Sequence, residues 1–127
     1  MPTSKKVLLD TNFLMIPGEI GVDIFNELER VCQFEYQVYI LDKTVKELEK
    51  IVEKQKGKYK EAAKLGLSLI KAKNIEIIPT EGDQYVDDIL VELQNEYIIA
   101  TQDKALKTKL KNIIILRQKK YLELIEA

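Results

Sequence analysis

Five short apolar runs alternate with longer segments of helical periodicity along the 127 residues of the chain. Apolar runs of four or five residues bounded by turn formers are typical of buried strands, whereas apolar residues that recur every three or four positions indicate helices. Strands joined by helices pair in parallel, so we expect one α/β domain over residues 1–127, in three layers around a mainly parallel, five-stranded sheet. The expected strands are Val7–Asp10, Gln37–Leu41, Ile75–Ile78, Ile98–Thr101 and Ile113–Leu116.

The segments between the strands predict helices. Pro17 and Gly18 are expected to end a short helix that begins near Phe13. Asp42 is expected to cap the N-terminus of the helix that follows it, because an aspartate side chain accepts hydrogen bonds from the first free N–H groups. The tail Tyr121–Ile125 is expected to add a last turn of helix. Further helices are expected over residues 23–32, 43–54, 59–73, 84–95 and 104–111.

The composition excludes several classes of chemistry. The chain has no histidine, which excludes Ser-His-Asp catalysis, an imidazole base and His-ligated zinc. A single cysteine, Cys32, cannot form an internal disulfide; it fits a reducing cytoplasm and is expected to be a buried structural thiol. The net charge of −1 gives no overall basic field. No run of about 18 apolar residues predicts a membrane span, so a cytoplasmic protein is expected.

Acidic residues follow the predicted strands. Asp10 and Asp103 come directly after a strand, while Glu47 and the pair Asp87-Asp88 lie in the helices after the second and third strands. In a right-handed parallel fold all of these positions belong to the carboxyl edge of the sheet. Carboxylates gathered there repel one another unless cations neutralise them, and oxygen ligands alone suit Mg²⁺ or Mn²⁺. Such a site can activate water and stabilise charge on a phosphate.

Each acid also has a simpler interpretation. Most of the 21 acidic residues must be solvated surface charges. Glu47 could pair with a neighbouring lysine on its helix, and Asp87 and Asp88 could complement the positive end of theirs. Helix periodicity leaves open which of Asp87 and Asp88 faces the site. Asp10 differs from the others, because an acid that ends an apolar strand needs a partner.

The ordered motifs Val7–Asn12, Val45–Leu48, Val86–Leu90 and Ile99–Asp103 resemble those of PIN domain ribonucleases. The chain is most similar to the small-subunit rRNA-processing PIN nucleases and their stand-alone archaeal relatives. The resemblance implies a Mg²⁺- or Mn²⁺-dependent ribonuclease, with Asn12 and Thr101 as supporting polar residues. Gln102 departs from the motif, since many members carry Asn there. By position, the resemblance implies that Asp10, Glu47, Asp103 and one acid of the pair Asp87-Asp88 bind the metal. We take Asp88 as the expected ligand of this pair, although the choice is open.

We therefore expect a metal-dependent endoribonuclease that hydrolyses single-stranded RNA, in RNA or rRNA processing. Lys104 and Lys107, directly after Asp103, are expected to contact RNA phosphates. The main alternative is the toxin ribonuclease of a toxin–antitoxin pair, and a noncatalytic RNA-binding PIN module is a second. A haloacid-dehalogenase phosphatase is disfavoured because Asn12 stands where that class has a second aspartate. A homodimer, a ribosome-assembly partner and an antitoxin partner all remain open.

Overall fold

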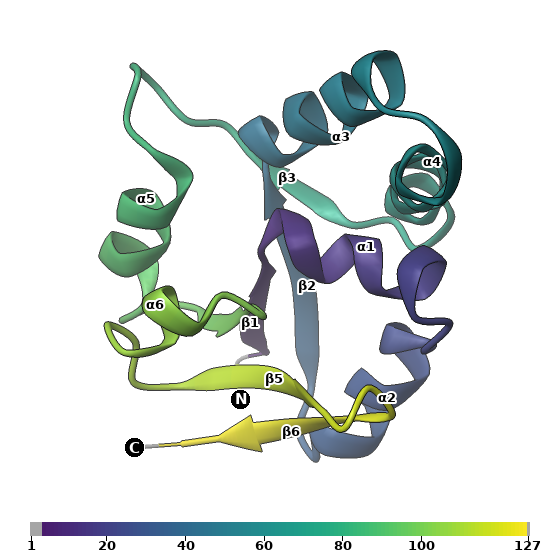
Figure 1. The fold of residues 1–127 in the computed structure, drawn as a ribbon. Coiled ribbons are helices and arrows are strands. Elements are labelled where there is room, and N and C mark those ends of the chain that lie inside the picture. The colour runs from purple at the N-terminus through teal and green to yellow at the C-terminus, as the bar shows by residue number, and fades with distance from the viewer. Residues whose placement is uncertain (1–3, 127) are drawn as a thin grey trace.

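Six strands form one sheet in the computed structural model, which describes residues 4–126. Their order is β3-β2-β1-β4-β5-β6; the first five pair in parallel, and β6 is antiparallel to β5 (Figure 1). The expected α/β class with a mainly parallel sheet is confirmed. After β1 the chain forms β2 and β3 on one side of it, and it then returns to the other side of β1 as β4. The carboxyl ends of β1 and β4 are therefore a topological switch point. The strands are β1 Lys5–Leu9, β2 Tyr36–Leu41, β3 Glu76–Ile78, β4 Ile98–Ala100, β5 Ile113–Arg117 and β6 Tyr121–Ile125.

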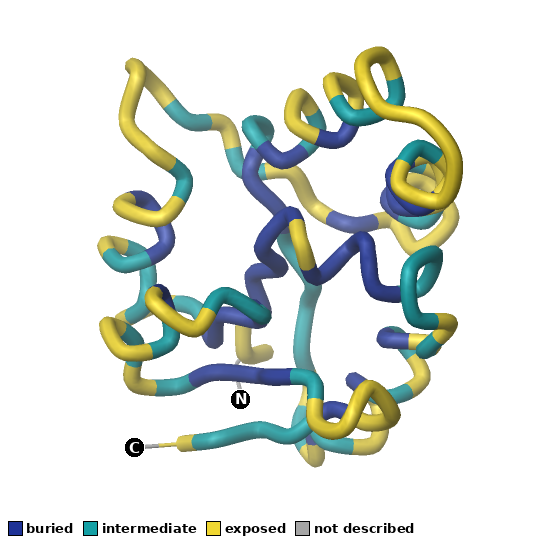
Figure 2. The backbone as a smooth tube through the Cα atoms, in the orientation of Figure 1, coloured by how far each residue is buried: buried dark blue, intermediate teal, exposed yellow. Residues whose placement is uncertain are grey.

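Helices cover both faces of the sheet, because alternate residues of each strand point to opposite sides. Val7 and Leu9 of β1 belong to a core that α1, α2, α3 and α4 complete, whereas Leu8 belongs to a second core under α5 and α6. Figure 2 shows that the buried stretches of the chain run through the centre of the molecule. The three expected layers are therefore present. The helices are α1 Thr11–Glu19, α2 Ile24–Val31, α3 Asp42–Lys54, α4 Gly57–Ala72, α5 Val86–Leu93 and α6 Lys104–Lys107.

The predicted count of five strands was wrong, because the tail forms β6 instead of a helical turn. Gln118 and Lys119 adopt left-handed backbone conformations and close a tight turn that pairs Arg117 with Tyr121. The tail then buries Leu122 on the sheet face that α2 covers. On the outer edge of β6, the N–H of Leu122 donates to Glu27 and its carbonyl accepts from Arg30. These two side chains of α2 satisfy backbone groups that an edge strand would leave free.

Two helix boundaries also differ from the predictions. Helix α1 continues through Pro17 and Gly18 to Glu19, because its buried residues pack across α4 and outweigh one lost backbone hydrogen bond. Helix α3 begins at Asp42 itself, and its N-cap is Leu41. The Asp42 carboxylate instead accepts hydrogen bonds from the backbone N–H and the hydroxyl of Thr80, at 3.1 and 2.6 Å. These two hydrogen bonds lower the pKa of Asp42 and fix the loop after β3 to α3.

Cys32 is buried, as predicted, and burial raises the pKa of its thiol to about 11. The thiol is therefore protonated at neutral pH and is a poor nucleophile. Within residues 4–126, no helix has the length and hydropathy needed to cross a membrane.

Candidate active site

Asp10 lies where β1 ends and α1 begins, and both of its carboxylate oxygens are held in place. It is the N-cap of α1, so Oδ1 accepts from the backbone N–H of Thr11 at 2.8 Å. Oδ2 accepts from the hydroxyl of Thr101 at 2.9 Å, and the Asp10 N–H donates to the carbonyl of Ala100. Asp10 therefore bridges β1 and β4 at the switch point, with only 6% of its surface exposed.

Thr101 links Asp10 to Asp103. Its buried hydroxyl oxygen accepts from the backbone N–H of Asp103 at 3.1 Å while its O–H donates to Asp10. Asp103 in turn caps α6, because its Oδ1 accepts from the N–H of Leu106. The turn from β4 into α6 thus places a second carboxylate one hydrogen-bonded residue away from Asp10.

Glu47 reaches the same edge from α3. Its Oε1 lies 3.1 Å from the hydroxyl oxygen of Thr11, which also lies 3.0 Å from the hydroxyl of Thr44. A carboxylate can only accept, so Thr11 donates to Glu47 and Thr44 donates to Thr11. The two threonines were not singled out in the sequence. Thr44 stands one helical turn before the buried Leu48, and this position on the apolar stripe of α3 was the available signal.

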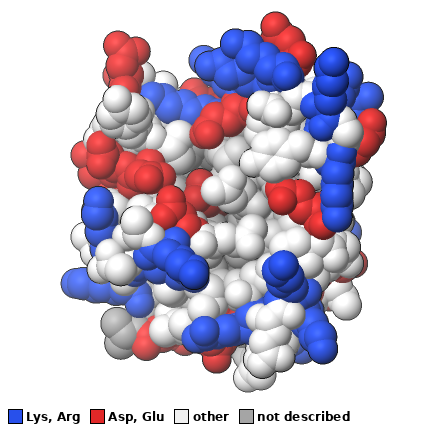
Figure 3. Space-filling view, viewed as in Figure 1, with Lys and Arg blue, Asp and Glu red and all other residues white. Residues whose placement is uncertain are grey.

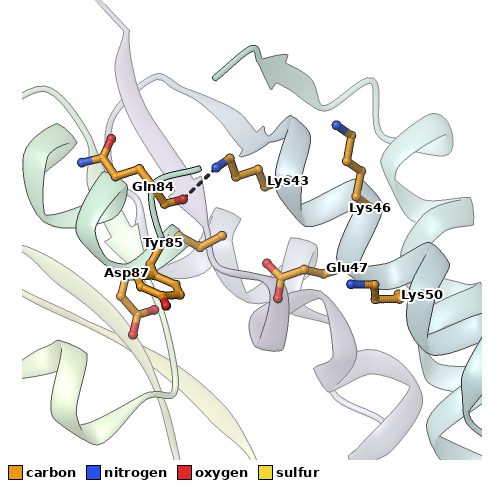
Figure 4. A pocket seen from close by; sticks show the side chains of 8 residues that line it. Lys43, Lys46, Glu47, Lys50, Gln84, Tyr85 and Asp87 are labelled. Atoms are coloured by element: carbon orange, nitrogen blue, oxygen red, sulfur yellow. Dashed lines mark hydrogen bonds between the residues drawn. The ribbon is translucent and has the colours of Figure 1, made fainter. Parts of the chain in front are cut away.

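The structure distinguishes Asp87 from Asp88. Asp87 lies in the first turn of α5 and lines, together with Glu47, a groove of about 490 Å³ between α3 and α5 (Figure 4). Burial raises the pKa of Asp10; the hydrogen bonds from Thr101 and Thr11 oppose this, and the charges of Asp87 and Glu47 add to it. Asp88, the acid of this pair that was expected to bind metal, does not line this groove. Of the pair, Asp87 is therefore the one that lines the groove beside Glu47.

The other predicted residues surround this cluster. Asn12 is exposed in the first turn of α1, and its backbone carbonyl accepts from the side chain of Gln102 at 3.3 Å. Gln102 therefore ties the turn after β4 to the start of α1. Lys104 is exposed and Lys107 half-buried on α6, immediately after Asp103.

A model of the PIN like domain matches residues 7–119 of the chain. The chain belongs to the PIN-like domain family. Ribonuclease VapC4 of Methanocaldococcus jannaschii is 32% identical over 126 residues, with 94% of this chain and 95% of the relative covered. Ribonuclease VapC9 of Archaeoglobus fulgidus is 34% identical over 107 residues, which cover 82% of this chain and 74% of the relative.

A solved structure of the PIN domain endonuclease Utp24 has a similar fold. It superposes with a TM-score of 0.72 at 25% identity, over 94% of this chain and 90% of that chain. The family resemblance predicted from the four motifs is therefore confirmed.

The acids of the candidate site have no basic partner within ion-pair distance in the described part of the chain. Across residues 4–126, ion pairs within 4.0 Å are limited to Arg30 with Glu27 and Arg117 with Glu123, both on the surface. Figure 3 shows acidic side chains gathered in the hollow between α3, α5 and α6, with basic side chains on α3 and near α6 around it. Carboxylates that face one another without a cation favour either proton or metal uptake.

The donor set fits Mg²⁺ or Mn²⁺. No three acidic or cysteine side chains among the described residues lie close enough to form a closed metal site. Mg²⁺ does not require one, since it keeps several waters and binds through one or two carboxylates plus substrate phosphates. A buried carboxylate oriented by two hydrogen bonds, whose pKa the charges of Asp87 and Glu47 raise, offers oxygen ligands of this kind.

Proposed function

We propose that this chain is a divalent-metal-dependent endoribonuclease that cleaves single-stranded RNA at the carboxyl edge of its sheet. Homology over most of the chain with two ribonucleases supports the ribonuclease activity. The observation that carries the metal dependence is Asp10, a buried carboxylate that faces Glu47 and Asp87 without a basic partner. A noncatalytic RNA-binding module would have no need of this arrangement of charges.

In this proposal Mg²⁺ or Mn²⁺ binds among the carboxylates of Asp10, Asp87, Glu47 and Asp103, with one or two of them as direct ligands. Asp87 takes the place of Asp88 because it lies across the groove from Glu47 and acts on the charge of Asp10. Thr101 orients Asp10, and Thr11 orients Glu47, through the hydrogen bonds described above. Asn12 stays a supporting residue through its backbone contact with Gln102.

The hydrolysis that these residues support needs no base from the protein with a pKa near 7. When bound, the metal lowers the pKa of water and stabilises the charge that develops on the phosphate. Water attacks phosphorus in line, the bond to the 3′ oxygen breaks, and the products carry a 3′-hydroxyl and a 5′-phosphate. Asp10 and Asp87 would hold the cation at the position where the phosphate of the RNA must lie. Lys104 and Lys107 neutralise neighbouring phosphates of the strand.

A cleavage assay on an unstructured RNA tests the proposal. We expect the wild-type protein to cut it with Mg²⁺ or Mn²⁺, and to stop in EDTA. Asp10→Asn and Asp87→Asn should lower the rate by about a hundredfold, the upper end of what the loss of a group that supports a metal ligand costs. Asp88→Asn is the matched control and should keep most of the activity. The Lys104→Ala, Lys107→Ala double variant should bind RNA more weakly with a flatter salt dependence, while its metal affinity stays the same.

Cleavage that persists in EDTA, or in Asp10→Asn, would contradict the metal-dependent mechanism. Products with a 2′,3′-cyclic phosphate would contradict the attack by water. If Asp88→Asn lost activity and Asp87→Asn kept it, the assignment within the pair would be reversed. Unchanged RNA binding and salt dependence in the double lysine variant would remove α6 from the RNA path.

For the biological role, we place a toxin ribonuclease of a toxin–antitoxin pair ahead of rRNA processing. Both curated relatives are VapC ribonucleases, and one of them matches over nearly its whole length. The likeness in fold to the Utp24 endonuclease is the support for the processing role. Induced expression of the wild type, but not of Asp10→Asn, should arrest growth, and a reading frame for an antitoxin beside the gene should relieve the arrest. Normal growth with active enzyme would return the role to RNA processing.

A further inference from the structure

The groove beside the acids has a second wall that the proposed catalysis does not use. It lies between the first half of α3 and the start of α5, and Glu47 and Asp87 line one end of it (Figure 4). The remaining lining consists of three lysines, one aromatic residue and two uncharged residues: Lys43, Lys46, Lys50, Tyr85, Gln84 and Val86. The groove therefore joins the acidic cluster to a surface of opposite charge.

The loop before α5 is fixed to α3 by four hydrogen bonds. Thr80 donates twice to Asp42, as described above, and the Lys43 ammonium donates to the carbonyls of Gly82 and Gln84, at 3.0 and 2.7 Å. Lys43 is thus committed to holding the loop. The two anchors bracket residues 80–84 and so determine where Tyr85, the next residue, stands.

Tyr85 is an aromatic residue whose side chain is exposed to solvent. It is 81% exposed, the most exposed of the large apolar side chains in the described part of the chain, and it stands at the N-cap of α5 without making a side-chain capping bond. An exposed ring on an anchored loop loses little conformational freedom when a flat partner stacks on it. Stacking of a nucleobase on such a ring contributes about 1–3 kcal/mol and accepts any base, provided that the base is unpaired.

Lys46 and Lys50 provide the charge for the phosphates of the same strand. They are one helical turn apart on the exposed side of α3, and neither has an ion-pair partner within residues 4–126. Lys46 also lowers the pKa of Asp42, so its charge acts on the carboxylate that anchors the loop before α5. Glu47 lies between the two lysines in sequence and reaches the acidic cluster. A strand that lies along these lysines is thereby led to the acids.

We propose that this groove binds single-stranded RNA beside the cleaved linkage, with one unpaired base stacked on Tyr85 and the flanking phosphates on Lys46 and Lys50. The inference rests on the proposed function and adds to it a substrate subsite with a requirement for unpaired bases. Tyr85 and Asp87 both line this groove (Figure 4), so the stacked base lies next to the site of cleavage.

A single tryptophan reports on the stacking. The chain has no tryptophan, so Tyr85→Trp places the only one in the groove, and Tyr59→Trp, at an exposed tyrosine on α4, is the matched control. The probe is a short RNA of mixed sequence without self-complementarity, in EDTA so that no cleavage occurs. We expect this RNA to quench the fluorescence of Tyr85→Trp and to leave that of Tyr59→Trp unchanged. The same RNA annealed to its complement should quench neither.

Affinities of further variants, measured in EDTA, complete the test. Tyr85→Ala should bind the RNA about tenfold more weakly, within the range measured for stacked bases. Lys46→Ala with Lys50→Ala should reduce the slope of log affinity against log salt by about 1.4, or about 0.7 for each phosphate of a single strand. Lys64→Ala with Lys71→Ala, two exposed lysines of α4, should change neither quantity.

The outcomes separate the two proposals. If the wild type cleaves RNA with metal, but saturating RNA leaves Tyr85→Trp unquenched or Tyr85→Ala binds as tightly as the wild type, the groove is not the RNA path and the nuclease proposal stands. Equal quenching by duplex RNA would overturn the requirement for an unpaired base. If the wild type neither binds nor cleaves RNA, the proposed function fails, and the subsite fails with it.

Discussion

Asp10 combines features that oppose one another in a folded protein. Burial raises its pKa, and so do the charges of Glu47 and Asp87, while two hydrogen bonds hold the carboxylate in a form suited to accept a cation. Without a cation, the ionised side chain is therefore disfavoured in the native state relative to the unfolded chain. Because of this cost, the wild type and a variant without the charge should differ in stability in opposite directions with and without metal.

We predict that Asp10→Asn stabilises the protein without metal and makes it less stable than the wild type with metal. In EDTA at pH 7 the variant should melt on the order of a few degrees above the wild type, because a neutral amide of the same size removes the buried charge. Mg²⁺ or Mn²⁺ should raise the melting temperature of the wild type above that of the variant, since a ligand that binds only the folded state stabilises it. Differential scanning calorimetry of both proteins in both conditions checks the prediction. Equal stabilisation of the two proteins by metal would argue against a specific site at Asp10.

The sequence predicted some of these residues and not others, for physical reasons. Asp10 and Asp103 follow strands, so the end of the strand locates them. The choice between Asp87 and Asp88 depends on the rotation of α5, and this rotation follows from where the helix begins, after a loop whose path the sequence does not show. Asp42 has the residue type of an N-cap, yet it bonds Thr80 in a distant loop. Local propensity cannot detect such a long-range partner.

At the scale of elements, the packing of α1 against α4 supports the site. Helix α1 carries Asp10 at its N-cap, and it lies so close to α4 that a Cβ on Gly18 would stand 2.4 Å from the Cα of Ala62. No side chain fits there without separating the helices. The Pro17-Gly18 pair thus serves a helix crossing, although in the sequence it predicted a helix end.

We predict that Gly18→Ala destabilises the protein by about 1–3 kcal/mol, the usual cost of overpacking. The melting temperature should fall by roughly 5–10 °C. Gly66→Ala in α4 is the matched control, because its added methyl would meet the carbonyl oxygen of Leu14 at 3.1 Å and the gain in helix propensity offsets part of that contact. Thermal denaturation of the three proteins tests this difference. A Gly18→Ala variant as stable as the wild type would show that the two helices can separate without cost.

The C-terminal strand shows why a short element is hard to assign from sequence alone. In residues 121–125, Leu122 and Leu124 belong to one core with Glu123 between them, but five residues are too few to separate this pattern from a turn of helix. What decides it is tertiary: the left-handed turn at Gln118 and Lys119, and the bonds from Glu27 and Arg30 to the backbone of Leu122.

At the scale of the whole molecule, the candidate site draws on four separate elements that end or begin at one edge of the sheet. Asp10 comes from the β1–α1 junction, Glu47 from α3, Asp87 from α5 and Asp103 from the β4–α6 turn. The parallel, right-handed topology made this convergence predictable, since all the strands bring their carboxyl ends to the same side. The groove between α3 and α5 could not be predicted from the sequence, because its shape depends on a loop that Asp42 and Lys43 anchor.

The central claim is that these acids bind a divalent cation, and a crystal soaked in Mn²⁺ tests it most directly. The anomalous signal of manganese locates the ion independently of any assumption about its ligands. We predict a peak within coordination distance of the carboxylates of Asp10 and Asp87, absent from crystals of Asp10→Asn and retained in crystals of Asp88→Asn. A peak on Asp88 away from Asp10, or none at this edge of the sheet in saturating Mn²⁺, would contradict the site.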